Sequence, residues 1–470
     1  MPRSFRRLIF RSPSALTVCL GIVFQLLCPG VTSAQDGVRE TESDIRELER
    51  QLRSLQEQLD EVARRQGDQA DSQEDVDFEL SPTWNRESRA VPGALRGVYD
   101  KPFFASLWRR AHVGGYTEVE FHDFEDGILG VPEGFRMHRT NLFFFSELSD
   151  RVRFGSEIEF ETEFEGHENS DDIEVKLEMA FVDWALFEEF KLRGGAILSP
   201  LGRVNVNHDG PVRELTERPL VSTFVIPTTL TEAGAGAHGT IAATEWLDFN
   251  YEAYAVNGFN ILKEDGSTTF AVTDREQALR EGRSSIGGDV NSGIASTGRF
   301  AAELFSSLDL GASWHHGTYD EKSDNFLTIV AGDFSFAQQC CDAVEFGLEG
   351  EIAEANFERD AFAKTSGIPG DFWGYYLQGS VGILPDPLRA IPYLFDDDGS
   401  RLTFVLRFEY VDLDGDRGEV IEPGINFRPI ADTVFKFSYR LTQKSIGLRD
   451  IPGRENFDDD GFVFSLASYF

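Results

Sequence analysis

Hydrophobic and polar side chains alternate without exception along residues 152–164, VRFGSEIEFETEF. Phe154, Ile158 and Phe160 share one parity, and the glutamates at 157, 159, 161 and 163 share the other. Successive strand residues point to opposite faces, so this segment predicts a strand with one apolar and one acidic face. Its thirteen residues reach roughly 43 Å, enough for a tilted membrane strand. Taken alone, the segment fits a membrane wall or a half-buried strand of a soluble sandwich equally well.

Similar segments recur to the end of the chain and predict sixteen strands. The expected strands are 113–122, 135–148, 152–164, 173–187, 190–198, 234–243, 247–257, 299–305, 308–319, 326–336, 344–357, 373–382, 402–410, 420–428, 433–441 and 462–470. The last ten residues of the chain, GFVFSLASYF, alternate and end on an aromatic residue, which is similar to the assembly signal of outer-membrane barrels. This ending departs from that signal at Ser468, where an aromatic residue is usual.

The connections between the first strands alternate in length. Long polar linkers follow the first, third, fifth and seventh strands, and turns of two or three residues follow the second, fourth, sixth and eighth. Short turns at one rim and long loops at the other are typical of an outer-membrane barrel. The connection 383–401 breaks this order, being long where a short turn is expected. Lipid offers no partner to an open sheet edge, so we expect a closed all-β, sixteen-stranded antiparallel transmembrane barrel with a wet lumen, at 111–470.

The first 34 residues predict export. Arg3, Arg6, Arg7 and Arg11 precede an apolar run, and Thr32-Ser33-Ala34 offers a small-residue cleavage site before Gln35. With those four arginines removed, 40 basic residues face 81 acidic ones, a formal charge of −41. Nucleic acid and anionic lipid are therefore excluded as favourable partners. The expected location is the bacterial outer membrane, with its lipid as a partner.

Residues 35–66 carry apolar positions at alternating three- and four-residue steps. Ile45, Leu48, Leu52, Leu55, Leu59 and Val62 form about three heptads. This spacing predicts a short periplasmic coiled coil, although a lone amphipathic helix acting as a spacer fits the same pattern. Residues 67–110 follow as a linker, which is polar and acidic at its start.

The long connection 200–232 is the main candidate for a functional element. Pro200, Pro211, Pro219 and Pro227 stiffen it. Its polar set consists of Arg203, Asn205, His208, Asp209, Arg213, Glu214, Glu217 and Arg218. Folded inward, such a loop would narrow the channel and set which solutes pass. A loop projecting outward as a surface cap is the alternative.

In this region the chain resembles the phosphate-selective porins O and P. The resemblance is carried by LSPLGRVN at 198–205, RPLVS at 218–222 and IPTTLTEAGAG at 226–236, with weaker support from GGYTEVEF at 114–121 and LRFEYVDLDGD at 406–416. It implies a sixteen-stranded trimeric barrel with an inward-folded third loop. The N-terminal coiled coil fits such a homotrimer.

The phosphate preference of that family does not follow from these residues. An anion filter needs converging Arg or Lys, whereas the expected pore-lining residues are Glu157, Glu159, Glu161, Glu163, Glu174 and Glu178. Arg203, Arg213 and Arg218 offer a local cationic girdle that Asp209, Glu214 and Glu217 would offset. We therefore predict a general diffusion pore for small ions and hydrophilic solutes, weakly cation-preferring.

Other chemistry is not predicted. The sequence predicts no catalytic constellation, metal site or cofactor: GxSxG and HExxH are absent, and the adjacent Cys340-Cys341 pair forms no disulfide framework. Acidic runs at 396–398, 412–416 and 458–460 predict solvated loops, with calcium binding as the alternative. Two rival functions stay open. One is a barrel hydrolase with a Ser or Thr beside His208 or another histidine at the rim, and the other is a soluble surface β protein that binds carbohydrate.

Overall fold

The computed structural model describes residues 105–108, 111–124, 133–162, 173–187, 189–271, 274–284, 286–287, 293–341, 343–383, 391, 394–395, 399–444 and 460–470. All belong to one compact unit, Leu80–Phe470. The predicted signal (1–34), coiled coil (35–66) and most of the linker lie outside the described residues, as does Glu163. Within the described part of the chain, no helix has the length and apolarity needed to cross a membrane.

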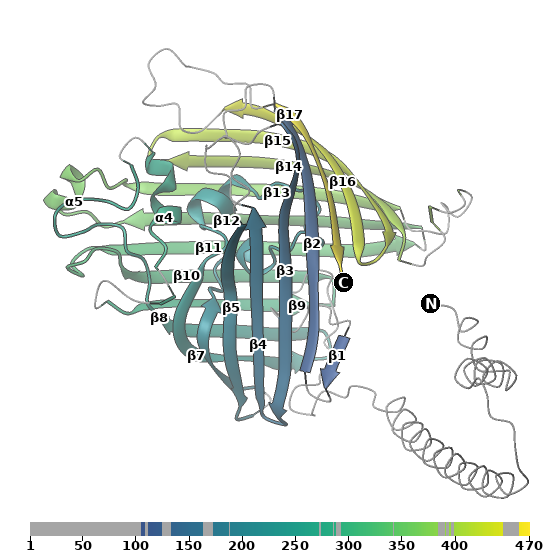
Figure 1. The fold of residues 1–470 in the computed structure, drawn as a ribbon, viewed down its shortest axis with the longest axis horizontal. Coiled ribbons are helices and arrows are strands. Elements are labelled where there is room, and N and C mark those ends of the chain that lie inside the picture. Colours follow the sequence, from purple (N-terminus) through teal and green to yellow (C-terminus); the bar gives the residue numbers. More distant parts are fainter. Residues whose placement is uncertain are drawn as a thin grey trace, which may run out of the picture. The chain divides into compact units, whose positions relative to one another are not determined.

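Strands make up nearly all of the regular secondary structure in the described residues (Figure 1). They are β1 Ala105–Trp108, β2 Ala111–Phe124, β3 Gly134–Ser149, β4 Val152–Thr162, β5 Ile173–Ala185, β6 Lys191–Leu198, β7 Thr231–Thr244, β8 Leu247–Val256, β9 Ala295–Leu304, β10 Leu308–Thr318, β11 Phe326–Cys341, β12 Val344–Phe357, β13 Asp371–Ile383, β14 Arg401–Leu413, β15 Asp416–Ile430, β16 Thr433–Lys444 and β17 Gly461–Tyr469. The short helical turns are α3 Arg203–Val206, η2 Val221–Val225, η3 Arg275–Gln277, α4 Ala278–Glu281 and α5 Ala361–Thr365.

The strands from β2 to β17 close into a ring, which confirms the predicted sixteen-stranded antiparallel barrel. Each pairs antiparallel with its neighbours in the sequence, and β17 returns to pair with β2 from Gly461 opposite Phe124 to Tyr469 opposite Tyr116. Beyond that ladder, the backbone groups of Phe470 and Gly115 exchange two hydrogen bonds. Closure leaves no open edge within this ring, as a lipid environment requires. The short β1 lies outside the ring and pairs with the start of β2.

The two faces of each strand separate as the alternation predicts. On β4, Phe160 is exposed on the outer face while Glu157 and Glu159 are buried inside. On β13, apolar side chains at 373, 375, 377, 381 and 383 point outward over about 33 Å of strand, or about 25 Å of barrel height at a 40° tilt. That height matches the apolar band of an outer-membrane barrel.

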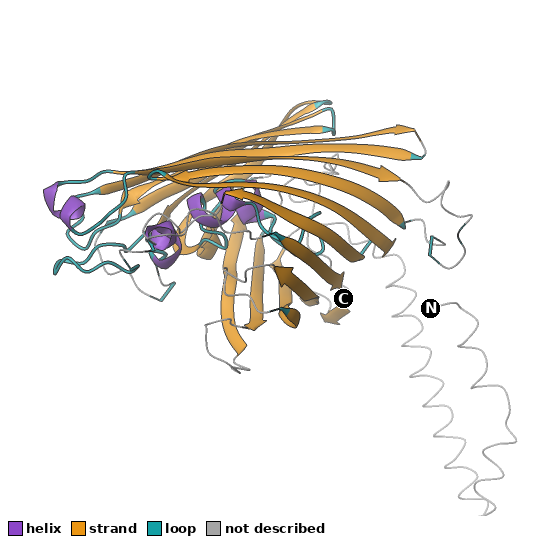
Figure 2. Ribbon diagram, turned by 90° about the horizontal axis from the view of Figure 1, so that it is seen from above, coloured by secondary structure: helices purple, strands orange, loops and turns teal. Residues whose placement is uncertain are grey.

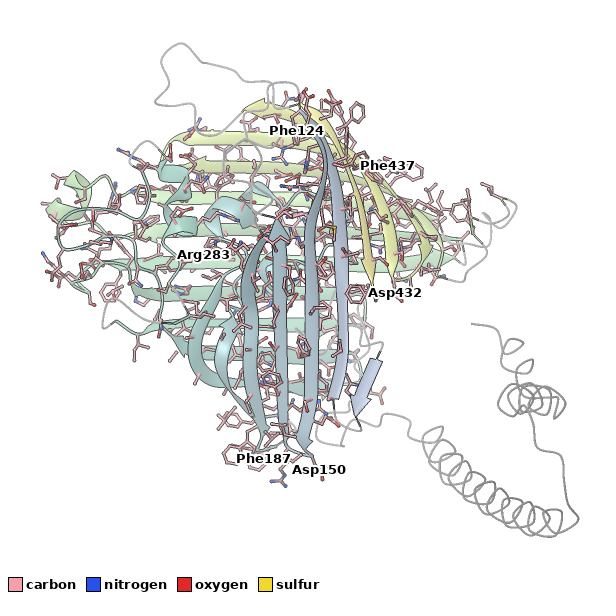
Figure 3. All side chains as sticks on the ribbon, in the orientation of Figure 1. Phe124, Asp150, Phe187, Arg283, Asp432 and Phe437 are labelled. Atoms are coloured by element: carbon pink, nitrogen blue, oxygen red, sulfur yellow. The ribbon has the colours of Figure 1, made fainter. Side chains whose placement is uncertain are left out.

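Aromatic side chains mark the rim of the short turns. Asp150 and Phe187, in two such turns, lie together at one end of the strands (Figure 3). Trp246 and Phe305, in two further turns, stack with ring centroids 5.1 Å apart, and both are exposed. Exposed rings at this level are typical of a membrane–water interface.

The connections follow the predicted alternation except at one point. Strand β13 ends at Ile383 at the short-turn rim and β14 starts at Arg401, so the long separation expected there is confirmed. At the opposite rim, β14 and β15 meet through only Asp414-Gly415, whereas the sequence pattern predicts a loop over 411–419. Both residues have positive φ, 56° and 95°, which is the conformation of an Asp-Gly hairpin turn. The acidic run 412–416 therefore forms a tight turn between two strands.

The third loop, residues 199–230, leaves the wall part-way along the barrel. Strand β6 has only eight residues and ends at Leu198, two residues beyond the pairing of Ala196 with Ala180 on β5. The neighbouring β5 continues toward the loop rim to Ile173. A chain that leaves a wall below its rim enters the lumen unless it turns outward through the sheet. Figure 2 shows several of the short helices on the concave side of the strands.

Candidate functional site: the loop inside the barrel

The third loop contacts the inner face of strands on both sides of the barrel. From α3 onward it reaches β12 through Glu351, β16 through Lys436, β15 through Arg428, β17 through Ser465, β2 through His122 and β14 through Glu409. The loop starts and ends between β6 and β7, which lie across the ring from β14 and β15, so it crosses the lumen to reach these strands. The inward fold predicted from the sequence is what the structure has.

Two buried carboxylates of the wall hold the loop backbone. Glu351 accepts hydrogen bonds from the amides of Arg203 and Val204 and from the Ser222 hydroxyl, 2.9 Å away. Glu409 accepts a bond of 2.7 Å from the amide of Leu220. Buried backbone donors must find acceptors, and charged acceptors give the stronger bonds. The two turns α3 and η2 are thereby fixed against β12 and β14.

Apolar packing holds the same part of the loop. Leu201, Val221, Val225, Ile226 and Leu230 are fully buried. Their core cluster also includes inward residues of the loop half of β11 to β14, among them Ile329, Ala331, Ala353, Ala355, Phe372 and Val411. Phe259 and Ile261 of the fourth loop, which connects β8 to β9, belong to the same cluster. Each large side chain buried in this way stabilises the arrangement by roughly 1.5–3 kcal/mol. The β11–β14 side of the lumen is therefore filled by protein.

The base of the loop is closed by Asn205. Its side-chain amide donates to the Ser199 carbonyl at 2.7 Å, and its oxygen accepts from the Leu230 amide at 2.8 Å. The Ser199 amide in turn donates to the Leu230 carbonyl at 2.9 Å. One buried side chain thus joins the two ends of the loop.

The other predicted loop residues mostly meet partners on the wall. Arg203 donates to Glu349 at 3.3 Å, His208 contacts Glu178 at 3.1 Å, Asp209 accepts from Tyr469 at 3.0 Å, Arg213 lies 3.6 Å from Glu118, Glu214 accepts from Asn426 at 2.6 Å, and Glu217 bonds His122 at 2.9 Å. The loop and the wall are thus joined by complementary polar groups.

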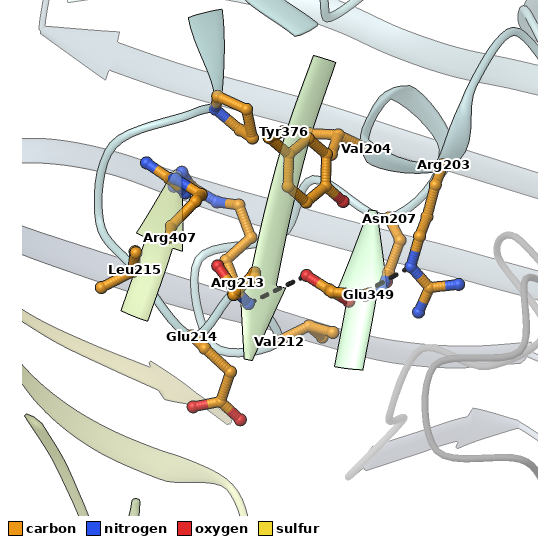
Figure 4. Close-up of a pocket in the computed structure, with 12 residues that line it drawn as sticks. Arg203, Val204, Asn207, Val212, Arg213, Glu214, Leu215, Glu349, Tyr376 and Arg407 are labelled. Carbon is orange, nitrogen blue, oxygen red and sulfur yellow. Dashed lines mark hydrogen bonds and ion pairs between the residues drawn. The ribbon is translucent and has the colours of Figure 1, made fainter. Parts of the chain in front are cut away.

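A small cavity lies between the loop and the β12–β14 wall (Figure 4). It measures about 60 Å³ and is lined by Arg203, Arg213, Glu349, Tyr376 and Arg407, among others. This volume holds one or two water molecules. The predicted residues Arg203, Arg213 and Glu214 meet here, next to wall residues that the sequence did not associate with them.

Arg218 belongs to a second group, with two arginines of the fourth loop that no sequence pattern connects to it. Arg218 and Arg280 donate to the Thr228 carbonyl at 3.0 and 3.2 Å, and Arg283 donates to the Thr229 carbonyl at 2.8 Å. Burial and the charges of Arg139, Arg213 and Arg280 lower the pKa of Arg218 to about 10, and burial and Arg280 do the same for Arg283. We call Arg218, Arg280 and Arg283 the arginine group. Its two loops meet only in the folded barrel, so no sequence spacing revealed it.

The glutamates of β4 and β5 differ in their surroundings. Glu157, Glu159 and Glu178 are buried, whereas Glu161 and Glu174 remain partly exposed on either side of Lys176, at 2.9 and 2.6 Å. Buried Glu157 accepts from Asn141 at 2.7 Å, and Glu159 from Arg139 at 3.3 Å. The predicted acidic strip therefore divides into a paired part beneath the loop and an accessible part nearer the loop rim.

Two sets of carboxylates and a histidine have donor atoms close enough to share a metal ion, among the described residues. They are Glu118–Glu120–His138 and Glu157–Glu178–His208, each with its donor atoms within 4.8 Å of one another. His315, also buried, bonds Glu232 at 2.9 Å, and its neighbour His316 bonds Thr328 on the other face, as strand alternation requires.

Comparison with known proteins gives few sequence matches and many structural ones. No protein-family model matches the chain. An uncharacterized protein of Aquifex aeolicus (strain VF5) is 32% identical over 219 residues, which cover 46% of this chain and 47% of that protein. The chain therefore matches about half the length of this relative.

Several solved outer-membrane proteins are similar in structure. OmpT of Vibrio cholerae gives a TM-score of 0.45 at 9% identity, with 78% of this chain and 100% of that chain covered. The channel DcaP of Acinetobacter baumannii gives 0.44 at 11%, with 78% and 99% covered, and an anion-selective porin from Comamonas acidovorans gives 0.46 at 11%, with 77% and 99% covered. Because these TM-scores and sequence identities are low, the evidence for the barrel architecture is the strand pairing described above.

Proposed function

We propose that this protein is an outer-membrane porin through which small hydrophilic solutes and ions diffuse. The observation that carries the proposal is a long polar loop folded across the lumen of a closed barrel whose outer face is apolar. The apolar band fits the hydrocarbon layer, and the loop narrows the lumen. The soluble carbohydrate-binding alternative offers no reason for a closed ring of sixteen strands with an exposed apolar belt.

The passage runs along the β2–β5 side of the lumen. The opposite side is filled by the apolar part of the third and fourth loops. On the β2–β5 side, partly exposed charged groups remain, namely Arg136, Glu161, Glu174 and Lys176. The arginine group faces the same region, since Glu161 and Glu174 are electrostatic neighbours of Arg283. Solutes would pass between these two sets of charges.

In this proposal the predicted constriction residues divide into two roles. Asn205, His208, Asp209, Glu214 and Glu217 fix the loop through their wall partners, and so does Arg203. Arg218 presents charge toward the passage, whereas Arg213 is paired with Glu118 of β2. The anchored backbone of the loop then sets the width of the pore, and a small number of charged side chains sets the electrostatic field inside it.

We further propose a weak preference for cations. Glu161 and Glu174 are the accessible acids, and the formal charge of the full chain is −37. The arginine group opposes this field, yet its members also bind the backbone carbonyls of Thr228 and Thr229. The resemblance to the phosphate-selective porins O and P is a hypothesis for ancestry and for a homotrimer, and it does not carry the ion preference.

Reversal potential across a salt gradient in a planar bilayer tests channel activity and charge preference together. We expect discrete conductance steps and a modestly cation-favouring potential. Glu161→Gln with Glu174→Gln should shift the potential toward anions, and Arg218→Gln with Arg283→Gln should shift it toward cations. A folded protein that forms no conducting steps would contradict the porin proposal. An anion-favouring potential in the unaltered protein would contradict only the ion preference.

A further inference from the structure

Side chains from two strands and the third loop meet beneath the loop. Glu157 of β4, Glu178 of β5 and His208 of the loop place one donor atom each within 4.8 Å of one another. Their side chains are at most 4% exposed. Two carboxylates held this close in a buried site favour a positive charge between them.

The orientation of His208 defines which nitrogen faces the carboxylates. Its Nδ1 lies 2.9 Å from the backbone carbonyl oxygen of Asn205, which can only accept, so Nδ1 carries the hydrogen. In the neutral ring Nε2 then presents a lone pair to the Glu178 carboxylate, 3.1 Å away. Two acceptors at this distance require a proton or a cation between them.

Asn141 supplies a second observation at the same place. Its amide nitrogen donates to Glu157 at 2.7 Å and to Glu178 at 3.0 Å, and the residue is fully buried. Its amide oxygen is buried without a hydrogen-bond partner. Rotating the amide by half a turn exchanges the two atoms and brings this oxygen to the carboxylates. That exchange is favourable only when a cation occupies the site.

We propose that Glu157, Glu178 and His208 bind one divalent transition-metal ion of the Zn²⁺ type, with the Asn141 oxygen as a fourth donor. An imidazole nitrogen with carboxylate oxygens suits Zn²⁺ rather than Ca²⁺ or Mg²⁺. Donor atoms around tetrahedral Zn²⁺ lie about 3.3–3.5 Å apart, so small side-chain rotations close the site. The bond from Nδ1 to a backbone carbonyl is the support that zinc-binding histidines usually have.

The second set of donor atoms has surroundings that do not suit a metal ion. Glu118, Glu120 and His138 are equally close to one another. Four basic groups already lie against these glutamates: Arg136 at 2.6 Å, Arg139 at 3.4 Å, Arg213 at 3.6 Å and Lys436 at 3.7 Å. An added dication would be repelled by them, so His138 offers a matched control.

A bound ion would link the interior of the third loop, at His208, to the barrel wall. His208 lies between α3 and the segment that contacts β15 to β17. Both glutamates belong to strands that lie across the lumen from β12 and β13. The ion would thus hold the loop against β4 and β5, complementing the apolar contacts with β11 to β14. This role concerns the folded loop and does not depend on which solutes pass.

The test is Zn²⁺ binding to the full-length protein without a histidine tag, folded in detergent and dialysed against a chelator. Isothermal titration should give one Zn²⁺ per barrel, at least tenfold weaker in His208→Ala and in Glu178→Gln and unchanged within twofold in His138→Ala. Zn²⁺ should also raise the thermal unfolding midpoint of the unaltered protein and of His138→Ala but not of His208→Ala. Heat-shifted mobility on a gel verifies that each variant is folded.

Two results would overturn the site: the absence of saturable Zn²⁺ binding, which would leave a proton between His208 and Glu178, or binding that survives in His208→Ala and is lost in His138→Ala. Tighter binding of Ca²⁺ than of Zn²⁺ would overturn the donor assignment. If the variants do not fold, Co²⁺ added to the unaltered protein gives the decision, because ligation by nitrogen and oxygen produces a visible absorption band that Zn²⁺ abolishes by displacement. None of these measurements involves current, so a failure of the porin proposal remains distinguishable.

Discussion

Asn205 joins the two ends of the third loop, and its replacement tests how much the loop depends on one side chain. Asn205→Ala removes the bonds to Ser199 and Leu230 and leaves their buried backbone groups without these partners. The expected cost is about 2 to 4 kcal/mol of local stability, since each buried unsatisfied group costs roughly 1–3 kcal/mol. We expect a folded barrel with larger current fluctuations and new protease cleavage within 199–230.

Asn207→Ala is the matched control, because Asn207 lies in the same loop and is only half-buried. Its removal should leave both the current noise and the cleavage pattern close to those of the unaltered protein. Equal effects of the two variants would mean that the polar clamp does not hold the loop.

Glu217 makes the anchoring of the loop sensitive to acid. Burial alone would raise the pKa of its carboxyl. The hydrogen bond and charge of His122 together have the larger effect and lower this pKa to about 2. A group whose pKa is lower in the folded state stabilises that state above its unfolded pKa of about 4.3 and loses this contribution as pH falls toward 2. Glu217→Gln should therefore flatten the pH dependence of unfolding between pH 5 and 2.

Guanidinium unfolding of the detergent-folded barrel at a series of pH values measures this effect. Glu245→Gln, in an exposed turn, should keep the slope of the unaltered protein. An unchanged slope in Glu217→Gln would show that the contact with His122 contributes nothing over this range.

At the scale of elements, β13 separates the lipid-facing from the lumen-facing side residue by residue. Leu377 is exposed near the middle of the apolar band, and Ile383 ends it at the short-turn rim. An arginine at the midplane of a barrel costs about 2–4 kcal/mol, falling to about 0–1 kcal/mol near the interfaces. Leu377→Arg should therefore destabilise the protein in lipid vesicles far more than Ile383→Arg.

Unfolding free energies in vesicles give the comparison, and detergent micelles give the control, because a micelle adapts to a charge more easily than a bilayer. Equal costs for the two variants in vesicles would place this strand outside a hydrocarbon layer and contradict the membrane assignment.

At the scale of the whole molecule, the barrel is closed without its N-terminal segment, while assembly is predicted to need it. The heptads within 35–66 are too few to be stable alone, so a coiled coil there requires barrels already side by side. Deleting 35–66 should leave the heat-shifted mobility of the folded barrel unchanged and weaken the trimer.

Cross-linking in membranes and light scattering in detergent measure the trimer fraction. A triple substitution is the control that keeps the chain length: it replaces Leu48, Leu52 and Leu55 by Ala. A deletion that leaves the trimer fraction unchanged would assign assembly to the barrel wall, and the absence of a trimer in the unaltered protein would remove the oligomer from the proposal.

Strand number and facing followed from the sequence because alternation is a local property. Each residue of 152–162 takes its side from the pleat alone, so the outward Phe160 and the inward Glu157 were predictable without any partner. Turn chemistry at Asp414-Gly415 was equally local, yet the acidic character of 412–416 favoured a longer loop over the hairpin that formed.

The partners across the lumen depended on closure of the ring. Arg218 and Arg283 are 65 residues apart and belong to different loops. His208 of the third loop contacts Glu178, which lies on strand β5. No periodicity connects such positions, because their distance depends on the circumference and on where β6 ends. The sequence by itself determined a two-faced ribbon of sixteen strands, and its export stays a prediction from residues 1–34. Only the tertiary structure decided which inward charges are paired beneath the loop and which remain accessible to solutes, because that division results from how the loop packs against a closed wall.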